Sequence, residues 1–169
     1  MSARRINGPA DVRFWAKVNK SGPVPQCNPQ LQECWEWTAS IAADGYGMFR
    51  MNGRTHKAHR ISYEFTHGAI PDGKCIDHRC RNRACVRPDH LRLVSKRQNS
   101  QHRDLDGHNS SGYRGVSWHK ASQRWSVYAT REGKRFYGGY FADIGDAEQA
   151  ARALRNSIFT HNDLDRIVR

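Results

Sequence analysis

The spacing of hydrophobic and polar residues divides the first half of the chain into short elements. Residues 11–18 (DVRFWAKV) are expected to form a short helix. Residues 34–39 (CWEWTA) and 45–53 (GYGMFRMNG) alternate as strands do, and the second segment ends in a glycine turn. A helix is expected in residues 56–68 (HKAHRISYEFTHG). Its apolar positions are Ala58, Ile61, Tyr63 and Phe65.

A strand, a loop, a second strand and a helix are expected next. Residues 74–77 (KCID) and 91–94 (LRLV) predict two strands, and residues 77–90 (DHRCRNRACVRPDH) form the loop between them. Ser95 is a candidate N-cap for a helix over residues 96–105, because its hydroxyl can accept a hydrogen bond from the first turn.

The second half predicts a three-stranded antiparallel sheet covered by one helix. The strands lie in residues 113–120, 124–130 and 131–141, with a hairpin turn at Glu132–Gly133. In the middle strand, Trp125, Val127 and Ala129 face one way and Arg124, Ser126, Tyr128 and Thr130 face the other.

A helix over residues 142–159 can cover the apolar face of this sheet, with Asp143 as its N-cap. Its apolar positions are Ala147, Ala150, Ala151, Leu154 and Ile158. Trp125 and Phe136 are interpreted as core residues. The other face of the sheet is left open and basic.

The composition changes once along the chain. Asparagine, aspartate, serine and glycine interrupt the pattern in residues 105–116 (LDGHNSSGYRGV), as a linker does. We therefore expect an α+β protein with a first domain over residues 1–106, a linker over residues 107–111 and a second domain over residues 112–169.

The chain is strongly basic. Lysine and arginine total 28 of the 169 residues, against 16 acidic residues, which gives a formal net charge of +12. This balance is typical of proteins that meet polyphosphate, so nucleic acid is the first partner to consider. A hydrophobic share of 37% with five tryptophans provides enough apolar material for a folded core.

No membrane or secretion signal is expected. No stretch approaches the roughly 20 apolar residues of a membrane span, and residues 1–15 contain no apolar signal segment. We therefore expect a cytoplasmic, intracellular protein without a membrane partner. Its five cysteines are then better interpreted as thiolates available to metal than as disulfides.

The loop at residues 77–90 has the spacing of a zinc site. Cys80-x4-Cys85-x4-His90 supplies three ligands of the kind that zinc prefers, and zinc requires four in a tetrahedron. We favour Cys34 as the fourth ligand, because a cysteine at a strand edge can lie beside the loop.

Cys27 and Cys75 remain alternative fourth ligands. As simpler interpretations, Cys75 is a small buried residue and Cys27 an unpaired loop thiol.

A histidine and an asparagine flank this proposed zinc loop. His78 is not needed as a ligand, and a histidine of ordinary pKa can accept a proton from water near neutral pH. Asn99 lies one turn into the following helix, and its amide oxygen is a hard ligand of the kind that Mg²⁺ accepts.

The pattern His78-x-Cys80-x4-Cys85-x4-His90-x8-Asn99 resembles the HNH nucleases of the His-Cys box (ββα-metal) type, which include many homing endonucleases. Cys34-Trp35-Glu36-Trp37 and His59-Arg60 extend the resemblance, which covers roughly residues 11–105. It implies a ββα-metal module of bacterial or phage origin. One structural Zn²⁺ per chain would be held by Cys34, Cys80, Cys85 and His90.

The same resemblance implies how a DNA phosphodiester is hydrolysed. His78 would be the general base, and Asn99, with Asp77, would bind the catalytic Mg²⁺ that stabilises charge at the phosphate and at the leaving 3′ oxygen. Arg60 and Arg50 are candidates for contact with the scissile phosphate, and His59 is a candidate packing or hydrogen-bonding residue. The loop arginines Arg79, Arg81, Arg83 and Arg87 are interpreted as a phosphate-facing surface.

Residues 112–160 are similar to the AP2 DNA-binding domain, best at YRGV, at GGYF and in the alanine-rich helix. Carried over by position, the similarity implies the following DNA-facing residues: Arg114, Ser117, His119, Arg124, Tyr128, Arg135, Tyr137 and Tyr140. Ser117 and His119 stand where plant members carry arginines, so the specificity of those members does not transfer. Arginines can nevertheless read guanine edges while their neighbours hold phosphates.

The leading hypothesis is a site-specific DNA endonuclease of the homing type, acting on double-stranded DNA and not on a small molecule. The alternative is a zinc-stabilised DNA-binding regulator with an inactive nuclease fold. The target sequence, cleavage of one or both strands, and the choice between monomer and homodimer stay open.

Overall fold

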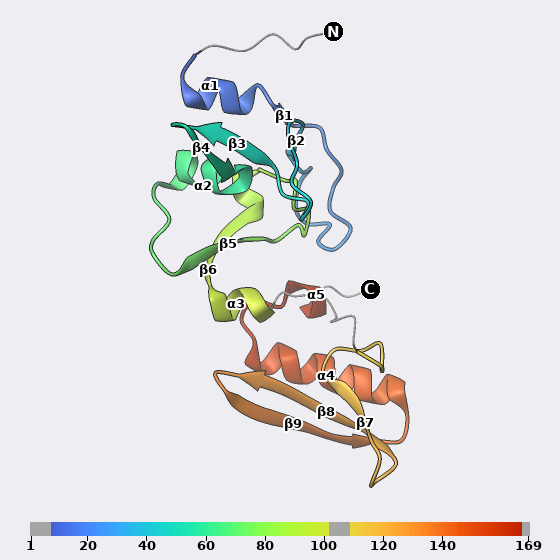
Figure 1. The fold of residues 1–169 in the computed structure, drawn as a ribbon. Coiled ribbons are helices and arrows are strands. Elements are labelled where there is room, and N and C mark those ends of the chain that lie inside the picture. Colours follow the sequence, from blue (N-terminus) through green and yellow to red (C-terminus); the bar gives the residue numbers. More distant parts are fainter. Residues whose placement is uncertain (1–7, 102–108, 167–169) are drawn as a thin grey trace. The chain divides into compact units, whose positions relative to one another are not determined.

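A computed structural model describes residues 8–101 and 109–166 of the chain. The chain divides into two compact units, Met1–Lys96 and Arg97–Arg169 (Figure 1). The division lies before the linker predicted at residues 107–111, of which the structure describes only residues 109–111.

The first unit is built from short elements. Its strands pair as three antiparallel sheets of two strands each in the described residues, β1 with β2, β3 with β4 and β5 with β6. The elements are α1 (Ala10–Trp15), β1 (Val18–Asn19), β2 (Glu36–Trp37), β3 (Met48–Met51), β4 (Arg54–Lys57), α2 (Ala58–His67), β5 (Lys74–His78), the 3₁₀ helix η1 (Pro88–His90) and β6 (Leu91–Ser95).

An aromatic cluster forms the core of the first unit. The ring of Phe14 in α1 is fully buried, with its centroid 4.9 Å from that of Trp37 and 5.2 Å from that of Phe49. Ile61 of α2 and Val86 belong to the same buried cluster. Because burial of apolar surface dominates folding, this cluster holds α1, α2 and the β1–β2 and β3–β4 sheets around one centre.

The helix predicted over residues 56–68 is confirmed as α2, directly after the β3–β4 hairpin. The hairpin turns at Asn52 and Gly53, whose φ angles of 50° and 75° suit a two-residue turn. The predicted apolar face of the helix is wrong at its end, because Phe65 is 39% exposed. His59 and Ser62 are buried instead.

Strand β5 extends further than the sequence predicts. It pairs with β6 in antiparallel register from Lys74 opposite Ser95 to His78 opposite Leu91. Asp77 and His78 therefore end a strand and do not belong to the loop, which starts at Arg79. The hydrogen-bonded ladder fixes the position of both residues.

The second unit contains the predicted three-stranded antiparallel sheet with one long helix packed on it (Figure 1). Its elements are α3 (Lys96–Gln101), β7 (Val116–His119), β8 (Arg124–Arg131), β9 (Lys134–Phe141), α4 (Ile144–Ile158) and α5 (Asp163–Arg166). Among the residues described in either unit, no helix combines the length and the apolar character needed to cross a membrane.

The core of the second unit lies between the sheet and α4. Val116 and Val127 of the sheet are buried against Ala147 and Ala151 of the helix. Trp125 packs against this cluster, as predicted. Phe136 was predicted to be a core residue, which is wrong: it is 37% exposed, near the turn of the β8–β9 hairpin.

A β-bulge interrupts the pairing of β8 with β9. Ser126 lies opposite Tyr140, whereas Tyr128 lies opposite Tyr137, so one extra residue of β9 is accommodated. Glycines make the bulge possible: a Cβ on Gly138 would lie 2.5 Å from Val127, and Gly139 has a φ of 110°. Because of this extra residue, Tyr137 and Tyr140 point to the same face, although strict alternation would place them on opposite faces.

Replacing Asp143 tests the N-cap of α4. Its Oδ1 accepts hydrogen bonds from the backbone N–H groups of Gly145 (2.7 Å) and Asp146 (3.1 Å). We expect Asp143→Ala to lower the free energy of unfolding by about 1 kcal/mol in urea denaturation followed by circular dichroism. Asp146→Asn removes only a charge from the first turn and should cost about 0.3 kcal/mol. Equal losses in both variants would contradict a specific cap.

Candidate active site and nucleic-acid interface

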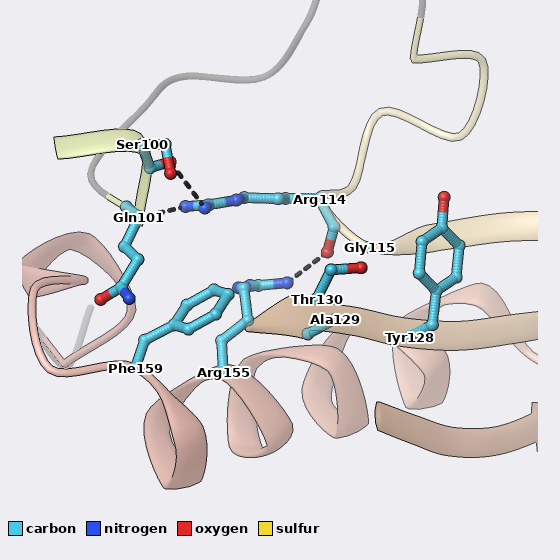
Figure 2. Close-up of a pocket in the computed structure, with 9 residues that line it drawn as sticks. All are labelled: Ser100, Gln101, Arg114, Gly115, Tyr128, Ala129, Thr130, Arg155 and Phe159. Carbon is cyan, nitrogen blue, oxygen red and sulfur yellow. Dashed lines mark hydrogen bonds between the residues drawn. The ribbon is translucent and has the colours of Figure 1, made fainter. Parts of the chain in front are cut away.

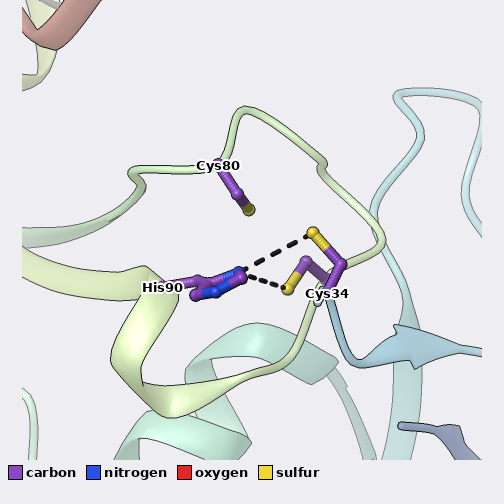
Figure 3. A group of neighbouring side chains, drawn as sticks. Cys34, Cys80 and His90 are labelled. Carbon is purple, nitrogen blue, oxygen red and sulfur yellow. Dashed lines mark hydrogen bonds between the residues drawn. The ribbon is translucent and has the colours of Figure 1, made fainter. Parts of the chain in front are cut away.

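Three cysteines and one histidine meet in a buried cluster (Figure 3). The ligand atoms of Cys34, Cys80, Cys85 and His90 all lie within 4.8 Å of one another. His90 Nδ1 is 3.7 Å from Cys34 Sγ and 3.6 Å from Cys85 Sγ, so Nδ1 is the ring atom that faces the sulfurs. We call these four residues the Cys–His cluster.

Backbone pairing brings Cys34 to the loop. Hydrogen bonds of 2.7 and 2.9 Å join residues 35–37 to residues 84–86. The Asn82 side chain adds a third link by donating to Glu36 Oε1 at 2.9 Å. Cys34 therefore lies beside the loop, as its place at a strand edge predicts.

The Cys–His cluster fits a zinc ion. In a tetrahedral zinc site, sulfur and nitrogen ligands lie about 3.5 Å apart, close to the separations in this cluster. Burial raises the pKa of Cys34 to about 12, and a hydrogen bond to Cys85 raises that of Cys80. Three thiolates in this buried place would require a cation, and a zinc ion would supply the charge.

The two alternative ligands lie elsewhere. Cys27 Sγ donates to the backbone carbonyl of Cys80 at 3.3 Å. Cys75 is in β5, opposite Val94. Neither belongs to the group of side chains whose ligand atoms converge.

His78 is oriented by the same loop. The side chain is 6% exposed, and its Nε2 lies 3.0 Å from the carbonyl oxygen of Cys85. Because a carbonyl only accepts, Nε2 carries the proton in this contact. Burial lowers the pKa of His78 to about 4, so the ring is neutral near pH 7 and its lone pair is on Nδ1. Cys85 thus contributes its thiol to the Cys–His cluster and its carbonyl to His78.

Two further rings lie beside His78. The ring centroid of His59 is 4.7 Å away and that of Tyr46 is 5.8 Å away. His59 is 5% exposed, and burial lowers its pKa to about 2, so it packs against His78 as a neutral ring. The sequence does not single out Tyr46, because its GYG segment carries only a strand pattern.

Asp77 pairs with an arginine that the sequence analysis does not single out. Its Oδ2 accepts a hydrogen bond from Nε of Arg92 at 2.8 Å and forms an ion pair with Nη2, also at 2.8 Å. The two residues are opposite each other in the β5–β6 register, which cannot be predicted without knowing the strand ends.

The loop arginines differ in their surroundings. Arg87 is 9% exposed, donates to the carbonyl of Glu33 at 2.8 Å and lies over the Trp35 ring. Its interpretation as a phosphate-facing residue is wrong, because the side chain is buried and its guanidinium bonds to other groups of the protein. Arg83 is exposed and donates to the carbonyl of Asp44 at 2.9 Å, and Arg79 and Arg81 are half-buried.

The remaining candidates of the first unit are both arginines. Arg60 is half-buried in α2, directly after His59, and Arg50 is exposed in β3. Asn99 is half-buried in α3, which is part of the second unit.

The face of the sheet opposite α4, here called the open face, gathers seven of the predicted DNA-facing residues. Cross-strand neighbours share a face, and the register pairs Ser117 with Ser126, His119 with Arg124 and Tyr128 with Tyr137. The seven residues are Ser117, His119, Arg124, Tyr128, Arg135, Tyr137 and Tyr140. Tyr137 is 73% exposed and Tyr140 50% exposed, so aromatic surface is available to a partner.

Arg114 is not part of the open face. Its guanidinium donates to the backbone carbonyls of Gln101 (2.7 Å) and Ser100 (3.3 Å) at the end of α3. It also lies over the Phe159 ring, 5.5 Å from the centroid.

Comparison with known protein families supports a nuclease module. Residues 56–101 match the HNH endonuclease family, from β4 through α3. The match includes Asp77, His78 and three members of the Cys–His cluster. It indicates an HNH endonuclease domain at residues 56–101.

Phage proteins are among the relatives. Protein 7.7 of Escherichia phage T7 is 34% identical over 48% of this chain and 63% of its own length. Protein 3.8 of the same phage is 35% identical over 47% and 65%, and the uncharacterized gene 5.3 protein of Enterobacteria phage T3 is 42% identical over 32% and 59%. The chain thus spans less than two thirds of the length of each of these relatives. No solved structure matches the chain.

Zinc content of single variants tests the ligand set. We expect the purified protein to retain about one zinc per chain after dialysis against a weak chelator, measured by mass spectrometry of the metal. Cys34→Ser should lose most of this zinc, because it removes one of four ligands. Cys27→Ser and Cys75→Ser are matched controls and should keep it. Zinc lost from Cys27→Ser but kept by Cys34→Ser would reverse the assignment.

Proposed function

We propose that the protein is a site-specific DNA endonuclease of the homing type, in which the HNH domain cuts and the second unit recognises the target. The observation that carries the proposal is the orientation of His78 by the Cys85 carbonyl, directly beside the Cys–His cluster. A neutral histidine held in this way has the chemistry of a general base.

His78 acts through Nδ1. The contact with Cys85 fixes the proton on Nε2, which leaves the Nδ1 lone pair to accept a proton from the attacking water. His59 and Tyr46 pack against the ring and limit its rotation. The hydroxide equivalent formed at Nδ1 then attacks phosphorus, in line with the leaving 3′ oxygen.

Asp77 and Asn99 are the residues that would hold a catalytic divalent ion such as Mg²⁺. A carboxylate and an amide oxygen are hard ligands and fit this ion. When bound, the ion supplies charge stabilisation at the scissile phosphate. Arg92 holds Asp77 in place by a hydrogen bond and an ion pair to Oδ2. The role of Asn99 rests on the sequence resemblance and on its place within the family match.

The Cys–His cluster has a structural role in this proposal. A zinc ion there would join Cys34 to the loop that carries the Cys85 carbonyl, so it would keep His78 in its orientation without taking part in the reaction.

The open face is proposed to contact double-stranded DNA in the manner of an AP2-like domain. Arg124 and Arg135 lie on strands β8 and β9 of this face and are both exposed. Guanidinium groups can pair with phosphates or with guanine edges, and the tyrosines supply apolar contact to bases.

Replacing the proposed base tests the nuclease activity. In the presence of Mg²⁺, the intact protein should cut DNA that carries its natural target, and chelation should stop cutting. We expect His78→Ala to lower the single-turnover rate by about 10²- to 10⁴-fold, because the general base is lost. Affinity for DNA and zinc content should stay unchanged, measured by filter binding and metal analysis.

His67→Ala is the matched control, since His67 is exposed at the end of α2 and stacks on Tyr63. It should cut like the parent protein. If the parent protein binds its target tightly but leaves it intact at every Mg²⁺ concentration, the DNA-binding regulator is the better description.

Charge removal tests the open face. We expect Arg124→Ala and Arg135→Ala each to weaken DNA binding and to lower the slope of log affinity against log salt by about 1, because each removes one phosphate contact. Arg152→Ala is the control, since Arg152 lies on α4 and pairs with Glu148 at 2.6 Å. An unchanged salt slope in both open-face variants would show that the open face does not contact DNA phosphates.

A further inference from the structure

Helix α3, which carries Asn99, buries no residue of its own. It has six residues, and helices shorter than about 12 residues are marginal in water without tertiary contacts. The contacts that other residues make with α3 therefore determine where it lies.

The C-terminal end of α3 is held by Arg114 and by its own Gln101 (Figure 2). The Arg114 guanidinium donates to the carbonyls of Gln101 and Ser100, at 2.7 and 3.3 Å. These are carbonyls that a helix end leaves without an intrahelical partner, and a cation is favourable there. The Gln101 side chain in turn accepts from the backbone N–H groups of Thr160 and His161, both at 3.2 Å.

Arg114 is held in turn by a residue of α4. Arg155 of α4 is 5% exposed and donates to the backbone carbonyl of Arg114. The Arg155 guanidinium also makes two hydrogen bonds of 2.7 Å to the carboxylate of Asp165. Ser100, Gln101, Arg114 and Arg155 line the pocket in Figure 2. The hydrogen bonds from α3 through Arg114 to Arg155 and on to Asp165 connect α3 to the fold of the second unit.

The family match thus groups α3 with the HNH domain, whereas the contacts of α3 group it with the second unit. By sequence, α3 is the last element of the HNH match, which ends at residue 101. By its contacts, α3 is held by Arg114, which lies before β7, and by Thr160 and His161, which follow α4. The Asn99 side chain is therefore carried on a helix whose position the second unit determines.

We propose that Arg114 and Gln101 are positioning residues for Asn99, and that the second unit supports catalysis as well as target recognition. This inference rests on the proposed function for the role of Asn99, and Arg114 then acts on α3 and not on DNA. Loss of the Arg114 contacts would loosen α3 without changing the open face.

Amide hydrogen exchange of the protein with its zinc retained, in the absence of Mg²⁺ and DNA, provides the first test. We expect Arg114→Ala and Gln101→Ala to speed exchange in residues 96–101 by about tenfold, because each removes two hydrogen bonds that hold the helix. Arg114→Lys can still donate to one carbonyl, so its exchange rate in residues 96–101 should lie between those of the parent and Arg114→Ala. The matched control is Arg131→Ala: Arg131 donates to the carbonyl of Ile158 at 2.7 Å, near the end of α4, and has the same chemistry on another helix. Exchange in residues 96–101 should stay at the parent rate in this control.

Cleavage and binding of the same variants provide the second test. At saturating DNA, Arg114→Ala and Gln101→Ala should require about tenfold more Mg²⁺ for half-maximal cleavage, with DNA affinity within about twofold of the parent. Arg124→Ala should show the opposite pattern, with weakened DNA binding and unchanged Mg²⁺ dependence.

The possible outcomes separate this inference from the proposed function. Parent-like exchange in Arg114→Ala and Gln101→Ala would overturn the positioning role. Faster exchange with unchanged Mg²⁺ dependence would overturn the link to Asn99 while the nuclease stands. A parent protein that does not cut would overturn the proposed function and with it the link to Asn99, whereas the exchange experiment would still decide whether Arg114 holds α3.

Discussion

The convergence of Cys34 with Cys80, Cys85 and His90 is the constraint on which the first unit depends. Residues 79–90 contain little regular structure apart from η1, so their shape follows from this cluster and from the backbone pairing with residues 35–37. The Cys85 carbonyl takes its position from the same cluster and orients His78. A structural cross-link and a proposed catalytic geometry are therefore one feature of the chain, which suits a small unit with a limited apolar core.

Part of the positive charge of this protein is used inside it. Arg87, Arg114, Arg131 and Arg155 each donate to a backbone carbonyl. A guanidinium suits this role because its planar fork offers several donors at fixed angles. Not every arginine that contributes to the formal net charge of +12 is therefore available to contact DNA. The arginines of the open face, Arg124 and Arg135, are distinguished by their exposure and not by their abundance.

The sequence predicted features that depend on local spacing. The sheet was predicted from alternation, and α4 from its apolar spacing and the Asp143 cap. The Cys–His cluster was predicted from the spacing of Cys80, Cys85 and His90. It could not predict features that depend on register or on distant contacts. Arg92 meets Asp77 only through the β5–β6 register, and Tyr46 reaches His78 only through the fold. Arg114 matched a DNA-facing position by resemblance. Its hydrogen bonds to α3 could not be predicted, because α3 lies on the other side of the predicted linker in the sequence.

The β-bulge in β9 has a consequence for how the open face can evolve. Gly138 and Gly139 shift the phase of the strand, so that Tyr137 and Tyr140 can both point outwards. Straightening of β9 without loss of a residue would turn one of the two tyrosines towards α4, because residues three positions apart face opposite ways in a regular strand. Substitution at the two aromatic positions leaves this phase unchanged, whereas a side chain at Gly138 would meet Val127 and disturb the bulge. The turn at Glu132–Gly133, beyond the paired residues, is where changes in length can be tolerated.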